Sequence, residues 1–224
     1  TNVNEVPSAI SLSANTIAEN VSVGSGVEIG ALTVSDPDAS GNNNVLSLSG
    51  ADMASFSIDN GKLMFTGSSP DFEAKSSYSV TVTSTDGSLD KSQHFTVSVT
   101  NVNEVPSAIS LSANTIAENV SVGSGVEIGA LTVSDPDASG NNNVLSLSGA
   151  DMASFSIDNG KLMFTGSSPD FEAKSSYSVT VTSTDGILVK SQAFTVSVTN
   201  VNEVPTLTAT CLLYTSDAAD EGLG

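Results

Sequence analysis

Apolar and polar residues alternate with a period of two along most of the chain. Seven short runs of this kind occur in the first repeat unit, at 10–12, 27–34, 46–48, 56–58, 63–65, 78–82 and 95–99. Because successive side chains of a strand point to opposite faces of its sheet, each run predicts a strand with one buried face and one exposed face. The segments between the runs are rich in Gly, Asn, Asp, Pro and Ser, which favour turns. No stretch predicts a long helix.

The whole pattern then occurs a second time. The segment Asn-Val-Asn-Glu-Val-Pro begins at Asn2, Asn101 and Asn200, which sets a repeat length of 99 residues. A repeat of this length is one small domain and not one turn of a solenoid. The two full copies differ at three positions, which are Ser88 and Ile187, Asp90 and Val189, and His94 and Ala193.

We therefore predict an all-β protein made of two tandem immunoglobulin-like, seven-stranded Greek-key β-sandwiches. The predicted limits are 1–102 for the first repeat, 103–201 for the second, and 202–210 for a linker and the start of a third repeat. Residues 211–224 resemble one reading frame of a sequencing adapter, so we interpret them as a non-native tail. The alternative is a divergent third domain, which resequencing of the gene beyond Thr210 would reveal. The one cysteine, Cys211, lies in this tail, so the repeats offer no disulfide and no thiolate ligand.

The chain is strongly acidic, with 25 Asp and Glu residues against 6 basic residues. Such a charge repels nucleic acid and anionic membranes, and no apolar run is long enough to cross a bilayer. We therefore expect no nucleic-acid partner and no direct membrane insertion. An acidic composition by itself could simply keep the protein soluble. The acids, however, gather in short clusters at predicted strand ends and loops, which lie at the poles of a sandwich.

Five acidic clusters of the first repeat carry a family resemblance. They are Glu19-Asn20, Asp36-Pro37-Asp38 with Gly41-Asn42, Asp71-Phe72-Glu73, Ser84-Thr85-Asp86 at the end of a strand led by Tyr78, and the linker residues Asn4-Glu5. In this order they resemble the cadherin repeat in its bacterial cadherin-like form, and the match covers both repeats from end to end. The resemblance implies a large repetitive surface adhesin, extracellular or at the cell surface, that binds Ca²⁺ at the junction between successive domains.

The resemblance also implies which residues bind the ion. For the complete junction it indicates Glu19, Asp71, Glu73, Asn103, Glu104, Asp135, Asp137, Asn141 and Asp185. For the N-terminal half-site it indicates Glu5, Asp36, Asp38 and Asp86, and for the C-terminal half-site Glu118, Asp170, Glu172 and Glu203. The chemistry agrees independently, because calcium takes about six to eight oxygen ligands and favours carboxylates. The linker is one residue shorter than the family pattern and begins with Asn101 in place of Asp, which leaves the number of ions per junction open.

An EF-hand loop is a further interpretation of one acidic cluster. The segment from Asp36 to Gly41 resembles the start of such a loop, in which the twelfth position is a bidentate Glu. Here the twelfth position is Ser47, and no helix is predicted on either side. We therefore reject this interpretation and retain the turn-forming and calcium-binding ones.

Catalytic chemistry finds little support in the sequence. His94 is the one histidine, and Ala193 takes its place in the second copy. A Ser-His-Asp triad or a zinc site therefore lacks its histidines. Asp71 and Glu73 are paired carboxylates of the kind that glycosidases use, but the chain has no Trp and few aromatic residues to line a sugar cleft. We expect that the protein is not an enzyme.

Two functions remain open at this stage. The first is a structural spacer, in which calcium at the junctions stiffens a rod-like array of neighbouring repeats in an adhesin. The alternative is a direct carbohydrate-binding or homophilic adhesion module, whose partner is a cell-surface glycan or protein. The near-identity of the repeats and the lack of an aromatic platform favour the spacer.

Overall fold

The computed structural model describes residues 3–38, 44–137 and 143–205. Asn141, the predicted start of a third repeat after Pro205, and the tail that contains Cys211 lie outside the described residues. Within the described ranges the chain consists of β-strands, turns and two short 3-10 helices, so the all-β prediction is confirmed. In the part of the chain that the structure describes, no helix has the length and hydrophobicity needed to cross a bilayer.

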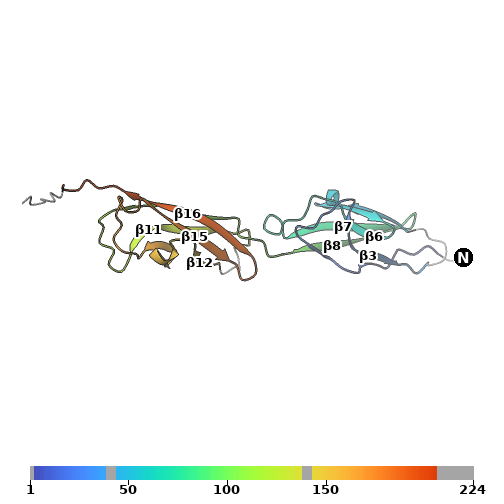
Figure 1. Cartoon of the computed structure of the whole chain (residues 1–224). Coiled ribbons are helices and arrows are strands. Elements are labelled where there is room, and N and C mark those ends of the chain that lie inside the picture. The colour runs from blue at the N-terminus through green and yellow to red at the C-terminus, as the bar shows by residue number, and fades with distance from the viewer. Residues whose placement is uncertain (1–2, 39–43, 138–142, 206–224) are drawn as a thin grey trace, which may run out of the picture. The chain divides into compact units, whose positions relative to one another are not determined.

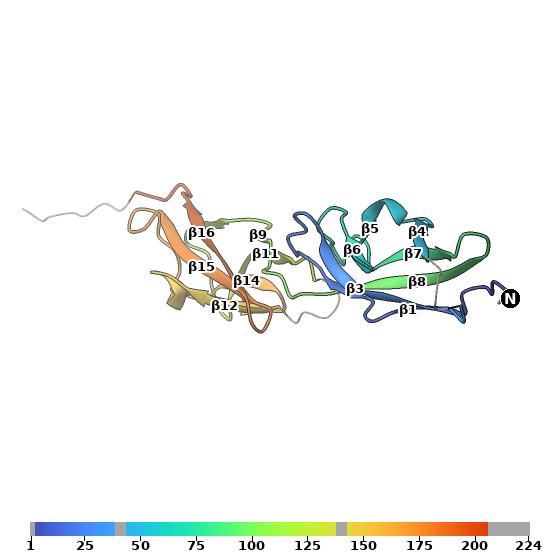
Figure 2. The same cartoon turned by 90° about the vertical axis from the view of Figure 1, so that its right-hand side faces the viewer.

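The first repeat forms two four-stranded sheets that share one core (Figure 1). Its elements are β1 (Ala9–Leu12), β2 (Thr16–Ala18), β3 (Val27–Ser35), β4 (Val45–Ser49), η1 (Met53–Ser55), β5 (Phe56–Asp59), β6 (Lys62–Phe65), β7 (Ser77–Thr85) and β8 (Asp90–Thr100). One sheet has the strand order β1-β3-β6-β5 and the other β2-β8-β7-β4. Figure 2 shows η1 as the coiled cyan ribbon that leads into β5.

The second repeat has the same elements and the same sheet orders. They are β9 (Ala108–Leu111), β10 (Thr115–Ala117), β11 (Val126–Ser134), β12 (Val144–Ser148), η2 (Met152–Ser154), β13 (Phe155–Asp158), β14 (Lys161–Phe164), β15 (Ser176–Thr184) and β16 (Val189–Thr199). The prediction of tandem immunoglobulin-like sandwiches is confirmed.

One strand in each repeat was not predicted. The chain leaves β1, which pairs with β3, and crosses to the other sheet, where β2 pairs in parallel with the end of β8. At this crossing Gly30 lies so close to Ala14 that a Cβ atom on Gly30 would be 2.7 Å from the Ala14 nitrogen, which is too close for any other residue. A three-residue strand is too short to give an alternating pattern, so the sequence did not reveal β2. Its position matters because it places the next residue, Glu19, beside the end of β8.

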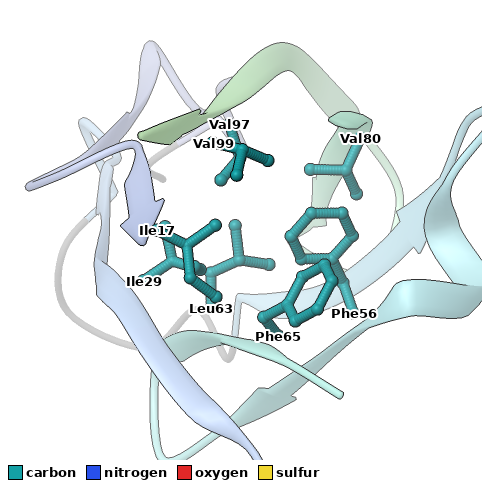
Figure 3. Close-up of a cluster of buried hydrophobic side chains, with 8 residues drawn as sticks. All are labelled: Ile17, Ile29, Phe56, Leu63, Phe65, Val80, Val97 and Val99. Carbon is teal, nitrogen blue, oxygen red and sulfur yellow. The ribbon is translucent and has the colours of Figure 1, made fainter. Parts of the chain in front are cut away.

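The core of the first repeat takes side chains from both sheets. Figure 3 shows its buried residues, which are Ile17, Ile29, Phe56, Leu63, Phe65, Val80, Val97 and Val99. Phe65 is fully buried and makes edge-to-face contacts with Phe56 and Tyr78, at ring-centroid distances of 5.4 and 4.9 Å. The period-two pattern predicts that all of these positions face inward except Ile17, which lies on β2.

A polar contact fastens η1 to the sheet. Asp52, which precedes η1, accepts a hydrogen bond from the Ser79 N–H at 2.8 Å and an ion-paired hydrogen bond from Lys75 Nζ. The Lys75 nitrogen also lies 4.8 Å from the centre of the Tyr78 ring. The hydrogen bond from Lys75, followed by that from the Ser79 N–H, holds the pKa of Asp52 below its usual value of 3.8.

Replacement of Asp52 by Asn is expected to lower the free energy of unfolding by about 1–2 kcal/mol, because the charge-assisted hydrogen bond from Lys75 is lost. Since the pKa of Asp52 is lowered on folding, its contribution is present above pH 3.8 and is lost as the pH falls through the lower folded-state pKa. Urea unfolding at neutral and acidic pH measures this difference. Asp59→Asn is the matched control, since Asp59 is exposed and bonds only to its neighbour Asn60 among the interactions described. Equal stabilities of the wild type and Asp52→Asn at neutral pH would contradict the assignment.

The described chain divides into two compact units. The first unit holds the first repeat, the linker that follows it, and two segments of the second repeat that include Asp137 and Asp185. The second unit holds the remainder of the second repeat. The domain limits given by the sequence at 102 and 201 stay predictions.

Candidate metal centre

Three glutamates from separate segments come together where the linker leaves each repeat. In the first repeat, Glu19, Glu73 and Glu104 each offer one carboxylate oxygen, and these oxygens lie within 4.8 Å of one another. The second repeat has the same arrangement, formed by Glu118, Glu172 and Glu203. We call each set a glutamate cluster. Each compact unit contains one complete cluster, so this geometry belongs to each unit by itself.

Glu19 is the residue around which the cluster is built. It follows β2 directly, and its N–H donates to the carbonyl oxygen of Thr100 at the end of β8. Its side chain is buried, and one carboxylate oxygen accepts the Val102 N–H at 2.6 Å while the other accepts the Phe72 N–H at 2.8 Å. A single carboxylate therefore joins the start of the linker to the loop that carries Glu73.

Two asparagine amides complete the contacts between the linker and the preceding repeat. Asn20 Nδ2 donates to Glu104 Oε1 at 2.8 Å, and Asn101 Nδ2 donates to Glu73 Oε1 at 2.9 Å. The second repeat has the equivalent hydrogen bonds from Asn119 to Glu203 at 2.6 Å and from Asn200 to Glu172 at 2.8 Å. Asn20 belongs to one of the acidic motifs and Asn101 departs from the family pattern, but the sequence indicated no role for either residue.

The carboxylates of a cluster titrate differently. Desolvation, and then the negative charge of Glu19, raise the pKa of Glu73. In the second repeat the Val201 N–H, and then the Phe171 N–H, lower the pKa of Glu118. In the second repeat, backbone donors therefore favour the ionised form of Glu118. The pKa of the exposed Glu172 beside it is raised, against a hydrogen bond from its own backbone, by desolvation and by the negative charge of Glu118. A bound cation would offset this negative charge.

The linker glutamates also contact the loop that follows them, through their backbone. The Glu104 N–H donates to Asp137 at 2.5 Å, and the Glu5 N–H makes the equivalent hydrogen bond to Asp38. Asp137 also accepts Asn101 Nδ2 at 2.8 Å and is 6% exposed. These contacts place the predicted ligand Asp137 beside the linker within the first compact unit.

Asp135 supports the same loop. One of its oxygens accepts the Asp137 N–H at 3.1 Å, and the other accepts Asn143 Nδ2 at 2.9 Å. In the first repeat Asp36 makes the same pair of hydrogen bonds, with Asp38 and Asn44. Both aspartates therefore fold the loop locally, as the turn interpretation of the sequence expects.

Asp185 and its counterpart Asp86 occupy equivalent turns, each near a linker asparagine. Each accepts the two N–H groups of a tight turn, and Asp185 Oδ2 in addition accepts Asn103 Nδ2 at 3.1 Å. In the first repeat Asn4 Nδ2 donates to Ser88 Oγ, and the buried Oδ2 atom of Asp86 has no hydrogen-bond partner among the described residues. A buried carboxylate oxygen in this state is one that a cation could satisfy.

Two further predicted ligands, Asp71 and Asp170, lie outside the glutamate clusters. Both are exposed, and each accepts the N–H three residues later in a turn, from Ala74 and Ala173. The ligand set as a whole therefore stays a prediction, within which the structure brings Glu19, Glu73 and Glu104 together.

The glutamate clusters have dimensions that suit a hard cation. Two oxygens that bind one Ca²⁺ at about 2.3–2.6 Å can be up to about 5 Å apart, and a separation within 4.8 Å meets this limit without rearrangement. The donors are carboxylates alone, with no imidazole or thiolate, which favours calcium or magnesium over zinc. The acidic clusters could therefore hold a metal ion.

Comparison with known proteins gives the fold independently of the site. No protein-family model and no curated protein matches the chain. The protocadherin gammaB7 EC3-6 cis-dimer structure matches with 26% identity and a TM-score of 0.64, over 88% of this chain and 48% of that chain. The extracellular cadherin domains 1-4 of protocadherin gamma B7 match with 28% identity and a TM-score of 0.65, over 86% and 51%. This chain thus spans about half the length of those structures.

A further match shows the fold alone. Human protocadherin-24 EC1-2 is 19% identical, with a TM-score of 0.66, and the match covers 89% of this chain and 100% of that chain. The similarity therefore extends over two successive domains in proteins whose sequences have diverged widely.

Proposed function

We propose that this chain, which consists of tandem cadherin-like repeats, binds Ca²⁺ where each linker leaves its preceding repeat and serves as a structural spacer in an extracellular adhesin. One observation carries the proposal. Glutamates that are far apart in the sequence meet within 4.8 Å at the base of the linker, and the same cluster forms in both repeats.

The proposed role of the ion follows from the origin of its ligands. Glu19 and Glu73 belong to the repeat, whereas Glu104 belongs to the linker. An ion shared by the three carboxylates would attach the linker to the repeat and remove the repulsion among them. Pro106 at the end of the linker fixes its own φ and biases Val105 toward extended conformations, which restricts the end of the linker.

The aspartates of the following loop would complete the coordination. Asp137 accepts the backbone N–H of Glu104, so its carboxylate lies close to the same stretch of linker. We assign Asn103, Asp135, Asp137 and Asp185 to the junction as further ligands, together with Asp71. By the same argument the half-sites are Glu5, Asp36, Asp38 and Asp86 at one end, and Glu118, Asp170, Glu172 and Glu203 at the other.

The spacer function predicts that calcium stiffens the chain. In small-angle X-ray scattering of the full chain, saturating calcium is expected to lengthen the maximum dimension and narrow the distribution of distances relative to chelator, because the ion restricts the linker. Glu104→Gln should abolish the difference, since it removes the linker carboxylate from the cluster.

Glu28→Gln is the matched control, because Glu28 is exposed on β3 and pairs with Lys62. It should respond to calcium as the wild type does. Identical scattering of the wild type in calcium and in chelator would contradict the spacer function.

A further inference from the structure

Each carboxylate of the first glutamate cluster already accepts a hydrogen bond across the boundary between repeat and linker. Glu19 accepts the Val102 N–H, Glu73 accepts Asn101 Nδ2, and Glu104 accepts Asn20 Nδ2, at 2.6–2.9 Å. The second cluster has the same three hydrogen bonds, made by Val201, Asn200 and Asn119 at 2.5–2.8 Å. The linker is therefore joined to its preceding repeat by donors that belong to the protein itself.

The orientation of the amides follows from the chemistry of their partners. An ionised carboxylate only accepts hydrogen bonds, so an asparagine that faces it must present Nδ2 and not Oδ1. A cation needs the opposite, since it binds oxygen lone pairs and repels the partly positive amide hydrogens. Asn20 and Asn101 thus supply to Glu104 and Glu73 some of the positive charge that an ion would supply.

The two asparagines reach these positions in different ways. Asn20 has a left-handed backbone, with φ of 57°, which Asn tolerates better than most residues, and its N–H donates to Pro70 O at 2.9 Å. Its counterpart Asn119 has φ of 58°. Asn101 follows β8 directly, and its Nδ2 donates to both Glu73 and Asp137, two carboxylates that an acidic side chain at this position would repel.

We propose that Asn20 and Asn101 form an amide latch, which holds the linker to its preceding repeat without an ion and, by competing for the same carboxylates, lowers their affinity for calcium. The second part rests on the proposed calcium-binding function, whereas the first part does not. Both asparagines are positioning residues, because they act through Glu73 and Glu104. The latch would keep the start of the linker ordered when calcium is scarce.

Two substitutions at Asn101 separate these effects. Asn101→Asp removes the amide donor and adds a ligand, whereas Asn101→Ala removes the donor alone. In chelator, both variants are expected to increase the hydrogen-exchange rate of the Val102 amide by at least about tenfold, because its attachment to Glu19 loses the support of the neighbouring bond. In calcium titrations, Asn101→Ala is expected to bind more tightly than the wild type, because it removes the competing donor, and Asn101→Asp about tenfold more tightly, because it also adds a ligand.

The chain supplies its own controls. The Val201 amide makes the equivalent hydrogen bond to Glu118 and should be unaffected by either variant, while the core amide of Val97 should stay protected if the repeat is folded. Asn60→Asp makes the same substitution in an exposed turn, where Asn60 Nδ2 also faces a carboxylate, and it should change neither readout.

Two results would overturn the latch. Unchanged exchange of Val102 in both Asn101 variants would show that Asn101 does not hold the linker. An affinity of Asn101→Ala no higher than that of the wild type would show that the amide does not compete with calcium. If no variant binds calcium, the proposed function fails instead, and the exchange rates measured in chelator still decide whether the latch exists.

Discussion

Replacement of Phe65 by alanine is expected to lower the free energy of unfolding of the first repeat by about 3–5 kcal/mol. The Phe65 side chain is fully buried at the centre of the core, where its ring contacts those of Phe56 and Tyr78 edge to face. The variant would leave a cavity between the two sheets and remove two aromatic contacts. Urea unfolding, followed by a probe of each repeat, measures the loss.

The second repeat provides a matched test of this prediction. Phe164 is also fully buried, and its ring lies at the same distances, 5.4 and 4.9 Å, from Phe155 and Tyr177. Phe164→Ala should therefore destabilise the second repeat by the same amount and leave the first unchanged. Val45→Ala, at a residue that is 63% exposed, should cost less than about 0.5 kcal/mol. A cost below about 1 kcal/mol for Phe65→Ala would contradict the core described above.

Calcium is expected to raise the free energy of unfolding by about 2.7 kcal/mol for each occupied site when its concentration is 100 times the dissociation constant. The folded chain brings the glutamates together, whereas the unfolded chain separates them, so the ion favours the folded state. Extracellular calcium-binding modules have dissociation constants of about 10⁻⁴–10⁻³ M, which makes millimolar concentrations the relevant range. Thermal unfolding in calcium and in chelator measures the gain.

The control for this stabilisation removes one carboxylate from each glutamate cluster. Glu73→Gln combined with Glu172→Gln should lose the gain from calcium, since these exposed glutamates complete the two clusters. In chelator the same double variant should be no less stable than the wild type. Desolvation, and then the negative charge of neighbouring glutamates, raises the pKa of Glu73, and the same two causes raise the pKa of Glu172 against a hydrogen bond from its own backbone. Their negative charge at neutral pH is therefore unfavourable without an ion. If calcium still raises the free energy of unfolding of the double variant, the ion binds outside the glutamate clusters and the assignment is wrong.

Much of the fold could be predicted from the sequence because the repeat is a two-sided sandwich. Alternation along runs such as Tyr78 to Val82 reports directly which face is buried, and the structure confirms that Val80 and Val82 are fully buried. The crossing from β1 to β2 could not be predicted in this way. It depends on a close approach between Gly30 on β3 and Ala14, which lies between β1 and β2, and no local pattern records such a contact.

The acidic residues of the candidate site could be predicted from the sequence, whereas the roles of its asparagine side chains could not. Glu19 and Glu73 belong to motifs whose order along the chain carries the family resemblance. The roles of Asn20 and Asn101 depend on partners 84 and 28 residues away, and an asparagine in a turn-rich sequence is ordinarily a turn former. Asn101 looked like a lost ligand in the sequence, whereas in the structure it is a donor to two carboxylates.

We expect the linker glutamates to bind calcium together with the preceding repeat, and calorimetric titration of the full chain with calcium measures this binding. The wild type should bind calcium, and Glu104→Gln combined with Glu203→Gln should bind at least about tenfold more weakly, because each cluster then loses its linker carboxylate. No binding by the wild type, or equal affinity in the double variant, would contradict this expectation.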